Sequence, residues 1–486
     1  MTATGGSSED GNSVMFPQVA PPERLVVRSR PQPSARGLSN SQYHRLNNRL
    51  AVALVAVVGL ATIPLASNRP ALWMIWSVVV SAIGLLYGAR LLLMGAPARV
   101  PLQRFALECA LICVLWLYLA VQLLPFAGFF PAPVTLADGS QIVSPSISLA
   151  PGDTALMLVT MGTFALLFFL FSQVAANRRR ARIALRALFL IIAASAIFAL
   201  ISLTQLGDTL LGFEKRYYLG FATGTFVNRN SFATFLASGL AIGIPVLLDS
   251  VSTALAEKSS RQWVFVGVVA AGIVFIVAAL LASGSRMGVF AGGAGALVTF
   301  GIGLFTIRNL GRSRLVFVLL AIVAAGALLI FYGSGVMERL IFTHDEDGRG
   351  ELYAQVWQAI LQRPWLGYGG GSFPSTFPVF QHAPLAGEVV WDHAHSTYLA
   401  LWFEMGLVFG SIPLLIIASL TVRSVLGFKD RSNNLLALSA VGVVVVFGLH
   451  SIVDFSAEIM ANAFLLIAVL ALGAGARAPS EQEQKA

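Results

Sequence analysis

Apolar and polar positions separate along the chain into long blocks, and apolar runs recur from residue 50 to residue 475. A helix needs about 20 apolar residues to span the hydrocarbon core of a bilayer. The runs therefore predict an all-α polytopic membrane protein with about twelve transmembrane helices. The predicted spans are residues 50–67, 71–94, 105–124, 153–175, 183–206, 231–249, 263–282, 287–307, 315–335, 396–422, 433–453 and 457–475.

Polar segments divide this pattern into five parts. Residues 1–48 are rich in Ser, Pro, Arg and Asn and are predicted to form a disordered cytoplasmic tail. Residues 49–335 hold the first nine spans, and 336–395 form one large loop. Residues 396–475 hold the last three spans, and 476–486 are a second short tail.

The large loop is predicted to contain short helices of its own. Leu352, Val356 and Ile360 recur every four positions, which indicates an amphipathic helix that ends before Pro364. The glycine run 367–371 lacks the Lys-Ser/Thr of a phosphate-binding P-loop, so it is predicted to be a flexible turn.

Composition agrees with a membrane protein. Charged residues make up 11% of the chain, against about 25% in soluble domains. The net charge of +9 would suit a nucleic-acid partner only on a soluble basic face; here the basic residues lie between apolar runs. The first run starts too far from Met1 for a signal peptide, and Cys109 and Cys113 share one run, as in helix packing.

The positive charges predict the orientation. If both termini are cytoplasmic, 24 of the 32 Lys and Arg residues fall on the cytoplasmic side, as the positive-inside rule requires. The remaining eight then lie outside, together with loop 336–395. We therefore expect a multi-pass protein of the bacterial inner membrane, with its polar loop in the periplasm.

Histidines gather on the predicted periplasmic side. His393 and His395 lie where the large loop enters the tenth span, and a histidine there has the titration range of a general base. One alternative is an interfacial residue that only hydrogen-bonds lipid headgroups. Another is a zinc site with Asp392, although no HExxH or cysteine pair accompanies it.

Four arginines on the same side form a second group: Arg69, Arg216, Arg286 and Arg349. Arg286 lies between two spans, where a charge needs a compensating anion. A guanidinium binds phosphate through two parallel hydrogen bonds, so converging arginines would bind a diphosphate without a metal. The alternative is a set of ordinary loop arginines paired with acids or headgroups.

Two acidic signals are weaker. Asp345 and Asp347 have the spacing with which many glycosyl-transferring enzymes hold a divalent ion, but an acidic triplet is also typical of an exposed loop tip. His450 and Asp454 are four residues apart and could face each other on one helix or cap the bundle. Elsewhere the sequence predicts no metal site and no cofactor.

Four motifs, in order, resemble those of the O-antigen ligase and polymerase superfamily. They are a Gly-x-Phe-x-Asn-x-Asn element at 224–230, a Ser-Arg pair at 285–286, a Gly-Arg to Pro-Trp-Leu-Gly-Tyr-Gly stretch at 348–369, and His-Ser-x-Tyr-Leu with Glu-Met-Gly at 395–406. The chain has Ser396 where the family usually has Asn. Lys215 beside Arg216 also leaves the matching basic residue ambiguous by one position.

This resemblance implies a metal-independent, inverting glycosyltransferase with a GT-C-like fold. Its donor would be a glycan on undecaprenyl diphosphate and its acceptor a periplasmic hydroxyl. His395 would be the essential histidine, Arg286 and Arg216 would bind the diphosphate, and Arg69 and Arg349 would assist. Candidate supporting residues are His393, Asp392, Glu404, Tyr398 and Asn230.

The acceptor separates two functions within that superfamily. Lipid A-core as acceptor makes an O-antigen ligase, and another polyprenyl-linked chain makes a polysaccharide polymerase; the sequence leaves both open. A flippase or secondary transporter would instead carry ionisable residues near the middle of its spans, which are nearly free of charge here. A membrane scaffold would not explain the gathered Arg and His residues.

Overall fold

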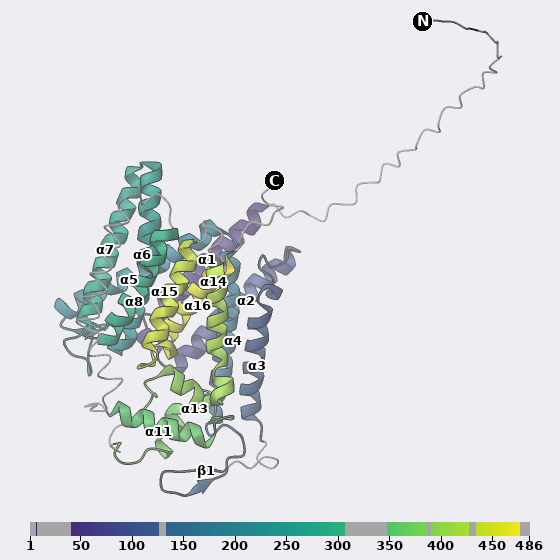
Figure 1. The fold of residues 1–486 in the computed structure, drawn as a ribbon, viewed down its shortest axis with the longest axis vertical. Helices are drawn as coiled ribbons and strands as arrows, with labels where there is room; N and C mark the ends of the chain where they lie inside the picture. Colours follow the sequence, from purple (N-terminus) through teal and green to yellow (C-terminus); the bar gives the residue numbers. More distant parts are fainter. Residues whose placement is uncertain are drawn as a thin grey trace, which may run out of the picture.

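The computed structural model of the protein describes residues 6, 40–125, 133–306, 348–385, 390–426 and 434–476. Most of them are helical, and the helices of the main bundle stand side by side (Figure 1). These helices are α1 (Asn40–Ala61), α2 (Pro70–Leu93), α3 (Ala106–Leu123), α4 (Pro151–Ala175), α5 (Arg178–Thr204), α6 (Arg229–Glu257), α7 (Ser260–Ala282), α8 (Arg286–Thr306), α14 (Ile412–Leu426), α15 (Asn434–His450) and α16 (Met460–Gly475).

Smaller elements join and cover the bundle. The short helices are α11 (Arg349–Gln362), α12 (Phe373–Thr376), α13 (Thr397–Gly410), and the 3-10 turns η1 (Leu65–Ser67), η2 (Leu102–Phe105), η5 (Phe377–Val379) and η8 (Ser456–Glu458). Two antiparallel hairpins pair β1 (Val134–Thr135) with β2 (Gln141–Ile142) and β3 (Thr209–Leu210) with β4 (Phe213–Glu214).

The fold is that of a polytopic helical membrane protein. Within the described ranges, seven helices are long and apolar enough to cross a membrane, running from α2 through α8. The α13–α14 pair passes the same test together, and α15 and α16 are shorter apolar helices. The predicted span 315–335 lies outside the described residues, so the number twelve stays a prediction.

The first helix begins earlier than the sequence predicted. The expected tail ran to residue 48 and the expected span from 50 to 67, but α1 starts at Asn40 and ends at Ala61. Polar side chains in its first turns are buried and hydrogen-bonded: the Tyr43 hydroxyl donates to the Pro97 carbonyl (2.8 Å) and Tyr87 donates to Asn47 (3.2 Å). Tertiary partners thus stabilise turns that a search for apolar runs overlooks.

Helix α6 is the central helix of the bundle, and 89% of an 18-residue apolar stretch within it is buried. It packs against α7, α8 and α15. Small residues permit this close approach, as is usual between membrane helices: a Cβ added at Gly239 would lie 2.4 Å from Ile192, and one at Gly243 would lie 2.6 Å from Phe189. The start of α6 is therefore held firmly relative to its neighbours.

One end of the bundle is covered by a layer that we call the cap, made of α11, α12, α13, hairpin β1–β2 and their connections. In Figure 1 the cap lies at the lower end, with α11 lying across the direction of the upright helices. Its core is aromatic, with Tyr368, Phe373, Phe377 and Phe403 fully buried and in ring contact. Burial raises the pKa of the Tyr368 hydroxyl. The predicted amphipathic helix in this loop is confirmed as α11.

The predicted span 396–422 is wrong as a single helix. The chain bends by 71° between α13 and α14. Gly406 has φ 71° and ψ 169°, a conformation that only glycine adopts readily, and a Cβ there would lie 2.5 Å from the Trp365 carbonyl oxygen. The Leu407 amide leaves the helical pattern and donates to the Pro364 carbonyl (2.7 Å). Gly406 lies inside α13, five residues before the break at Ser411, and it is apolar, so hydropathy alone revealed neither irregularity.

The glycine run 367–371 is a turn, as predicted, and its backbone pairs with α13. The Tyr368 amide donates to the Phe403 carbonyl (3.0 Å), and the Gly369 amide donates to the Glu404 carbonyl (2.9 Å). Gln122, at the end of α3, donates to the Glu404 carbonyl (3.1 Å) and accepts from the Gly370 amide (2.9 Å). The bonds of Gln122 fasten the cap to the bundle just before Gly406.

Candidate functional site

His395 lies between the cap and the bundle, two residues before α13. Its backbone has φ 51°, a left-handed conformation that is uncommon outside glycine and recurs at active sites. The Tyr353 hydroxyl of α11 donates to the His395 carbonyl (2.9 Å). The imidazole makes edge-to-face contacts with Trp391 and Phe455, at centroid distances of 5.6 and 5.2 Å. Helix α11 therefore holds the backbone of His395, and two aromatic side chains hold its ring.

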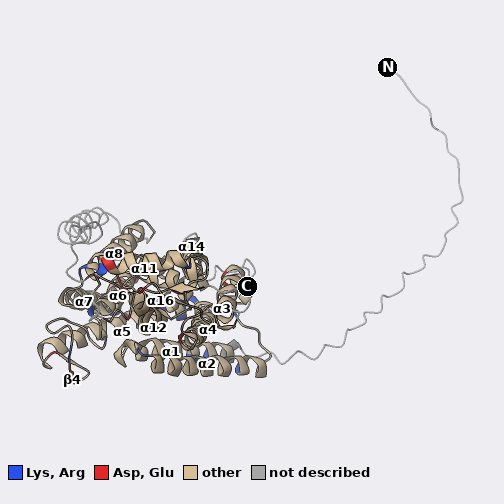
Figure 2. Ribbon diagram, turned by 90° about the horizontal axis from the view of Figure 1, so that it is seen from below, with Lys and Arg blue, Asp and Glu red and all other residues tan. Residues whose placement is uncertain are grey.

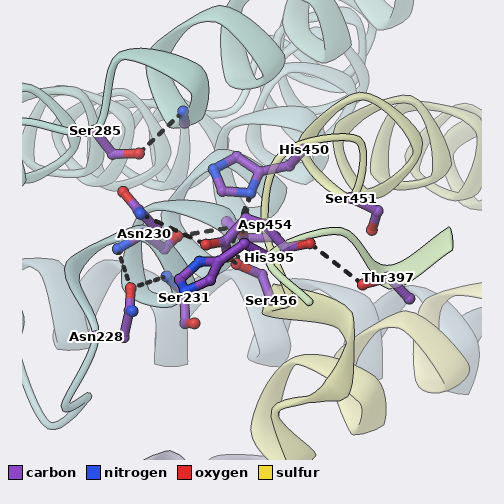
Figure 3. Close-up of polar contacts among 12 residues, drawn as sticks. Asn228, Asn230, Ser231, Ser285, His395, Thr397, His450, Ser451, Asp454 and Ser456 are labelled. Carbon is purple, nitrogen blue, oxygen red and sulfur yellow. Dashed lines mark hydrogen bonds and ion pairs between the residues drawn. The ribbon is translucent and has the colours of Figure 1, made fainter. Parts of the chain in front are cut away.

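A buried polar network adjoins His395 (Figure 3). Asp454 and His450 are each 1% exposed, and their carboxylate Oδ2 and Nδ1 atoms are 3.7 Å apart. The Ser456 hydroxyl donates to Asp454, and Asn230 Nδ2 lies 3.5 Å from Asp454 Oδ1. His450 and Asp454 face each other, as one of the two readings of their spacing allowed, but they do not share a helix, because α15 ends at His450. Asp454 lies in the turn after α15. Its carboxylate contacts Asn230 of α6, and its carbonyl accepts a hydrogen bond from the Thr397 hydroxyl, two residues after His395.

The 224–230 motif supplies the other wall of this network. The Asn228 side chain caps α6 by accepting hydrogen bonds from the amides of Asn230 (2.7 Å) and Ser231 (3.2 Å). Asn462 of α16 donates to the Ser231 carbonyl (3.0 Å). These bonds at the start of α6 therefore direct the Asn230 side chain toward Asp454, as Figure 3 shows.

Three of the predicted diphosphate-binding arginines are exposed: Arg69, Arg216 and Arg286. Arg69 precedes α2, Arg216 follows hairpin β3–β4, and Arg286 is the first residue of α8. No hydrogen bond or ion pair joins their side chains to another residue that the structure describes. Their positive charges are open to an anion from solution or from a lipid.

Hydrogen bonds bring the segments that carry these arginines together. The Ala222 amide donates to the Ala282 carbonyl (2.9 Å), which joins the segment after Arg216 to the turn before Arg286. The Thr225 hydroxyl donates to the Thr62 carbonyl (2.6 Å) in the turn before Arg69. Gly284, with φ 63°, allows its turn to lie against Phe221, 2.5 Å from where a Cβ would be.

The neighbouring lysine has a different role from Arg216. Lys215 is ion-paired with Asp208 and also donates to the Phe221 carbonyl (2.8 Å). Its side chain is only 5% exposed. Of the two adjacent cations, Arg216 is therefore the one open to a ligand.

Arg349 belongs to the histidine region rather than to the exposed arginines. It is the half-buried first residue of α11, the helix whose Tyr353 bonds the His395 carbonyl. The structure thus divides the four arginines: three are exposed at or before the starts of α2, α6 and α8, and one is half-buried at the start of α11 in the cap.

The candidate supporting residues have separate contacts. His393 stacks on Phe455 at 3.7 Å and pairs with Glu458 (3.1 Å). Tyr398 donates to the Gly448 carbonyl (2.8 Å). Glu404 is buried and accepts from the Phe373 amide (3.3 Å), whereas Asp392 is exposed. His393 and Tyr398 tie the cap to the bundle and Glu404 joins two parts of the cap, so their contacts support the position of His395.

Sequence reasoning did not single out Arg229 or Tyr353. The Arg229 guanidinium lies over the rings of Phe221 and Tyr218, at 4.3 and 5.5 Å from their centroids, and the Cβ position of Gly284 lies 3.2 Å from its Nη1. Its position inside the 224–230 motif was the available signal. Tyr353 carried no motif, because its bond to the His395 carbonyl depends on how α11 docks.

Metal ligands do not cluster in the part of the chain that the structure describes: no group of three His, Cys, Asp or Glu side chains is arranged to hold an ion. His393 and Asp392 thus lack a third ligand among those residues. Asp345 and Asp347 lie outside the described residues.

The arrangement defines a class of protein, a helical membrane protein with an imidazole, a buried carboxylate and open arginines at one end. Residues 271–415 match a protein-family model described as O-antigen ligase. The match includes Arg286, Arg349 and His395, and it confirms the resemblance to the O-antigen ligase superfamily. It supports a glycosyltransferase-like membrane enzyme with glycan or lipid-linked substrates. A comparison with curated proteins finds no match to the chain.

Proposed function

We propose that the protein transfers a glycan from undecaprenyl diphosphate to a hydroxyl group at the periplasmic face of the inner membrane, as an O-antigen ligase. One observation carries the proposal: His395 and the open arginine Arg286 both lie within the segment that matches the O-antigen ligase model, at the cap end of the bundle. A base for the acceptor and cations for the leaving group are the two requirements of this transfer.

The arginines would act on the donor. Arg286 and Arg216 would bind the diphosphate, with Arg69 beside them on the joined turns and Arg349 on the cap side. Their charge would stabilise the departing polyprenyl diphosphate, the type of electrostatic contribution that usually dominates catalysis. The reaction would then need no divalent metal, because guanidinium groups neutralise the leaving group.

His395 would act on the acceptor. Its imidazole would accept the proton of the hydroxyl that attacks the anomeric carbon, while the bond to the diphosphate oxygen breaks. A single displacement inverts that carbon. Contacts with Tyr353, Trp391 and Phe455 limit the movement of His395, so the base is already oriented before the acceptor arrives.

Glycan analysis of a deletion strain tests this function against the polymerase of the same superfamily. A ligase deletion removes polymer from lipid A-core and leaves long polyprenyl-linked chains. A polymerase deletion leaves single repeat units. Unchanged surface glycans and unchanged polyprenyl-linked pools would contradict both activities and would favour a transporter or a scaffold.

The orientation of the bundle is tested separately. We expect both termini in the cytoplasm and the cap in the periplasm, because the Lys and Arg count is three to one in that direction. Reporter fusions after Asn177, before α5, and after Trp365, in the cap, should report opposite compartments. The same compartment for both would contradict the topology and the periplasmic site.

A further inference from the structure

Helix α11 has an exposed apolar side that the packing of the cap does not use. Its buried side, which includes Leu352, Val356 and Ile360, packs against the cap core. On the exposed side, Trp357 is 40% exposed and Leu361 is 57% exposed; Trp365, just beyond the helix, is 64% exposed. Trp357 and Leu361, on one side of this 14-residue helix, and Trp365, just after it, form an exposed apolar set that we call the Trp strip.

The Trp strip lies at the level where the spans end. Helix α11 packs on α13 and runs across the direction of the upright helices (Figure 1). Tyr398, in the first turn of α13, bonds the Gly448 carbonyl in the last turn of α15, and Gln122 at the end of α3 bonds the backbone of Leu366. The cap backbone beside Trp365 is therefore held at the ends of two bundle helices.

Exposed apolar side chains continue the Trp strip toward the bundle. The indole of Trp357 contacts that of Trp402 in α13, with centroids 6.3 Å apart. Val408 and Leu415, beyond Trp402 along the chain, are 53% and 54% exposed. An apolar surface thus passes from α11 to the outside of α14. Tryptophan is enriched at the boundary between headgroups and acyl chains, because its ring is apolar and its N–H is polar.

Charge and polarity on α11 fit the same location. Its other exposed positions include Gln358 and Gln362, which are neutral and polar and can face water. Its only charged residues, Arg349 and Glu351, lie in its first turn. Attachment to a bilayer would therefore depend on apolar contacts and would need no anionic lipid.

We propose that α11 is an interfacial helix whose Trp strip inserts into the headgroup–acyl boundary of the membrane leaflet on the cap side. The helix then sets the height of the cap, and with it the height of His395, which is bonded to α11 through Tyr353. The inference needs only the geometry of α11, and it holds whether the enzyme is a ligase, a polymerase or neither.

Site-specific quenching tests the proposal. Cys109 and Cys113 are replaced by serine, and a single cysteine is introduced by Leu361→Cys, in the Trp strip, or by Gln358→Cys, as the matched control three residues away. Each variant receives an environment-sensitive fluorophore. The full chain is reconstituted into vesicles of phosphatidylethanolamine with phosphatidylglycerol, and into vesicles of phosphatidylcholine alone.

The two probes should respond in opposite ways. Nitroxide lipids labelled near the top of the acyl chain should quench the Leu361 probe severalfold more than the Gln358 probe. Iodide on both sides of the vesicle should quench the Gln358 probe more. The same result is expected in phosphatidylcholine and at high salt, because apolar contacts carry the attachment.

Three results would overturn the proposal. Equal access of iodide to both probes would place the Trp strip in water. Shielding of the Leu361 probe from both quenchers would show that a protein surface covers it, such as a second copy of the chain. Stronger quenching by nitroxides near the bilayer centre would make α11 part of a span.

Discussion

The two ends of the bundle hold their arginines in different ways. At the end opposite the cap, Arg186 and Arg182 pair with Asp249 at 3.0 and 3.6 Å. Arg423 donates to the buried Glu108 carboxylate (2.6 Å), which also accepts from Ser419. At the cap end, the acids have other partners, since Asp208 pairs with Lys215, Glu458 with His393, and Asp454 with Ser456.

The difference separates structural cations from available ones. Each arginine–acid pair at the end opposite the cap joins two helices, α5 with α6 or α3 with α14. At the cap end, Asp208, Glu458 and Asp454 are engaged elsewhere, and the described residues leave the side chains of Arg69, Arg216 and Arg286 without an acidic partner. A view toward the cap end shows how few charged residues the tan ribbon carries (Figure 2). Against that background, three exposed arginines without an acidic partner are available to an anionic ligand.

The largest effect is expected at His395. The His395→Ala variant should lose about 10²–10⁴-fold in transfer rate, the usual contribution of a general base, and retain its affinity for the donor. Single-turnover transfer and donor binding in lipid vesicles measure the two quantities. His44→Ala, at an exposed histidine of α1, is the control. An intact transfer rate in His395→Ala would remove the histidine from the mechanism.

Arg286 should affect both binding and rate. Loss of a hydrogen-bonded charge costs about 1.5–3 kcal/mol, so Arg286→Ala should weaken donor binding by about 10–100-fold and slow transfer as well. Arg286→Lys keeps the charge but loses the planar fork, and it should restore binding better than rate. Arg90→Ala, at an exposed arginine in the last turn of α2, is the control. Unchanged donor affinity in Arg286→Ala would exclude this arginine from the diphosphate site.

Glu108 should affect stability alone. Glu108→Gln removes the charge that pairs with Arg423, so the free energy of unfolding should fall by about 1–3 kcal/mol. The transfer rate per folded molecule should not change, because the pair lies at the end opposite the cap. Thermal unfolding in detergent and the transfer assay give both values, with Glu257→Gln as an exposed control. A large loss of activity in folded Glu108→Gln would break the distinction between the two ends.

The smallest effect is expected from Asp345 and Asp347. If arginines neutralise the diphosphate, the double variant Asp345→Ala with Asp347→Ala should transfer glycan at nearly the normal rate. Chelation of divalent ions should likewise change little. A collapse of activity that added magnesium or manganese partly restores would show that these aspartates bind a catalytic ion.

Much of the fold could be predicted from the sequence, because hydropathy reports the environment of each segment. The long apolar runs became α2 through α8, and the four-residue spacing of Leu352, Val356 and Ile360 became α11. The errors occurred where tertiary contacts outweigh hydropathy. Tyr43 and Asn47 extend α1 through buried hydrogen bonds, and the break between α13 and α14 depends on backbone contacts with residues far along the chain.

The candidate site was predictable in its residue types but not in its geometry. Motifs indicated His395, Arg286 and Asn230, each at the start of a helix or just before one. They could not show that Tyr353 holds the His395 carbonyl or that Asp454 meets Asn230, because those contacts join segments that are 42 and 224 residues apart.

The break between α13 and α14 also has a consequence for how the protein is made. During synthesis, the membrane-insertion machinery receives residues 397–426 as one apolar segment. The folded chain nevertheless bends within this segment, and the bend leaves backbone groups that lipid cannot hydrogen-bond. Their partners, the Pro364 carbonyl and the amides of Tyr368 and Gly369, emerge from the ribosome earlier. The hydrogen-bonding partners of the bend, which act as a template on which it docks, are therefore synthesised before the bend itself. Biogenesis should stall if that template is supplied late, as in a circular permutant that starts at residue 397.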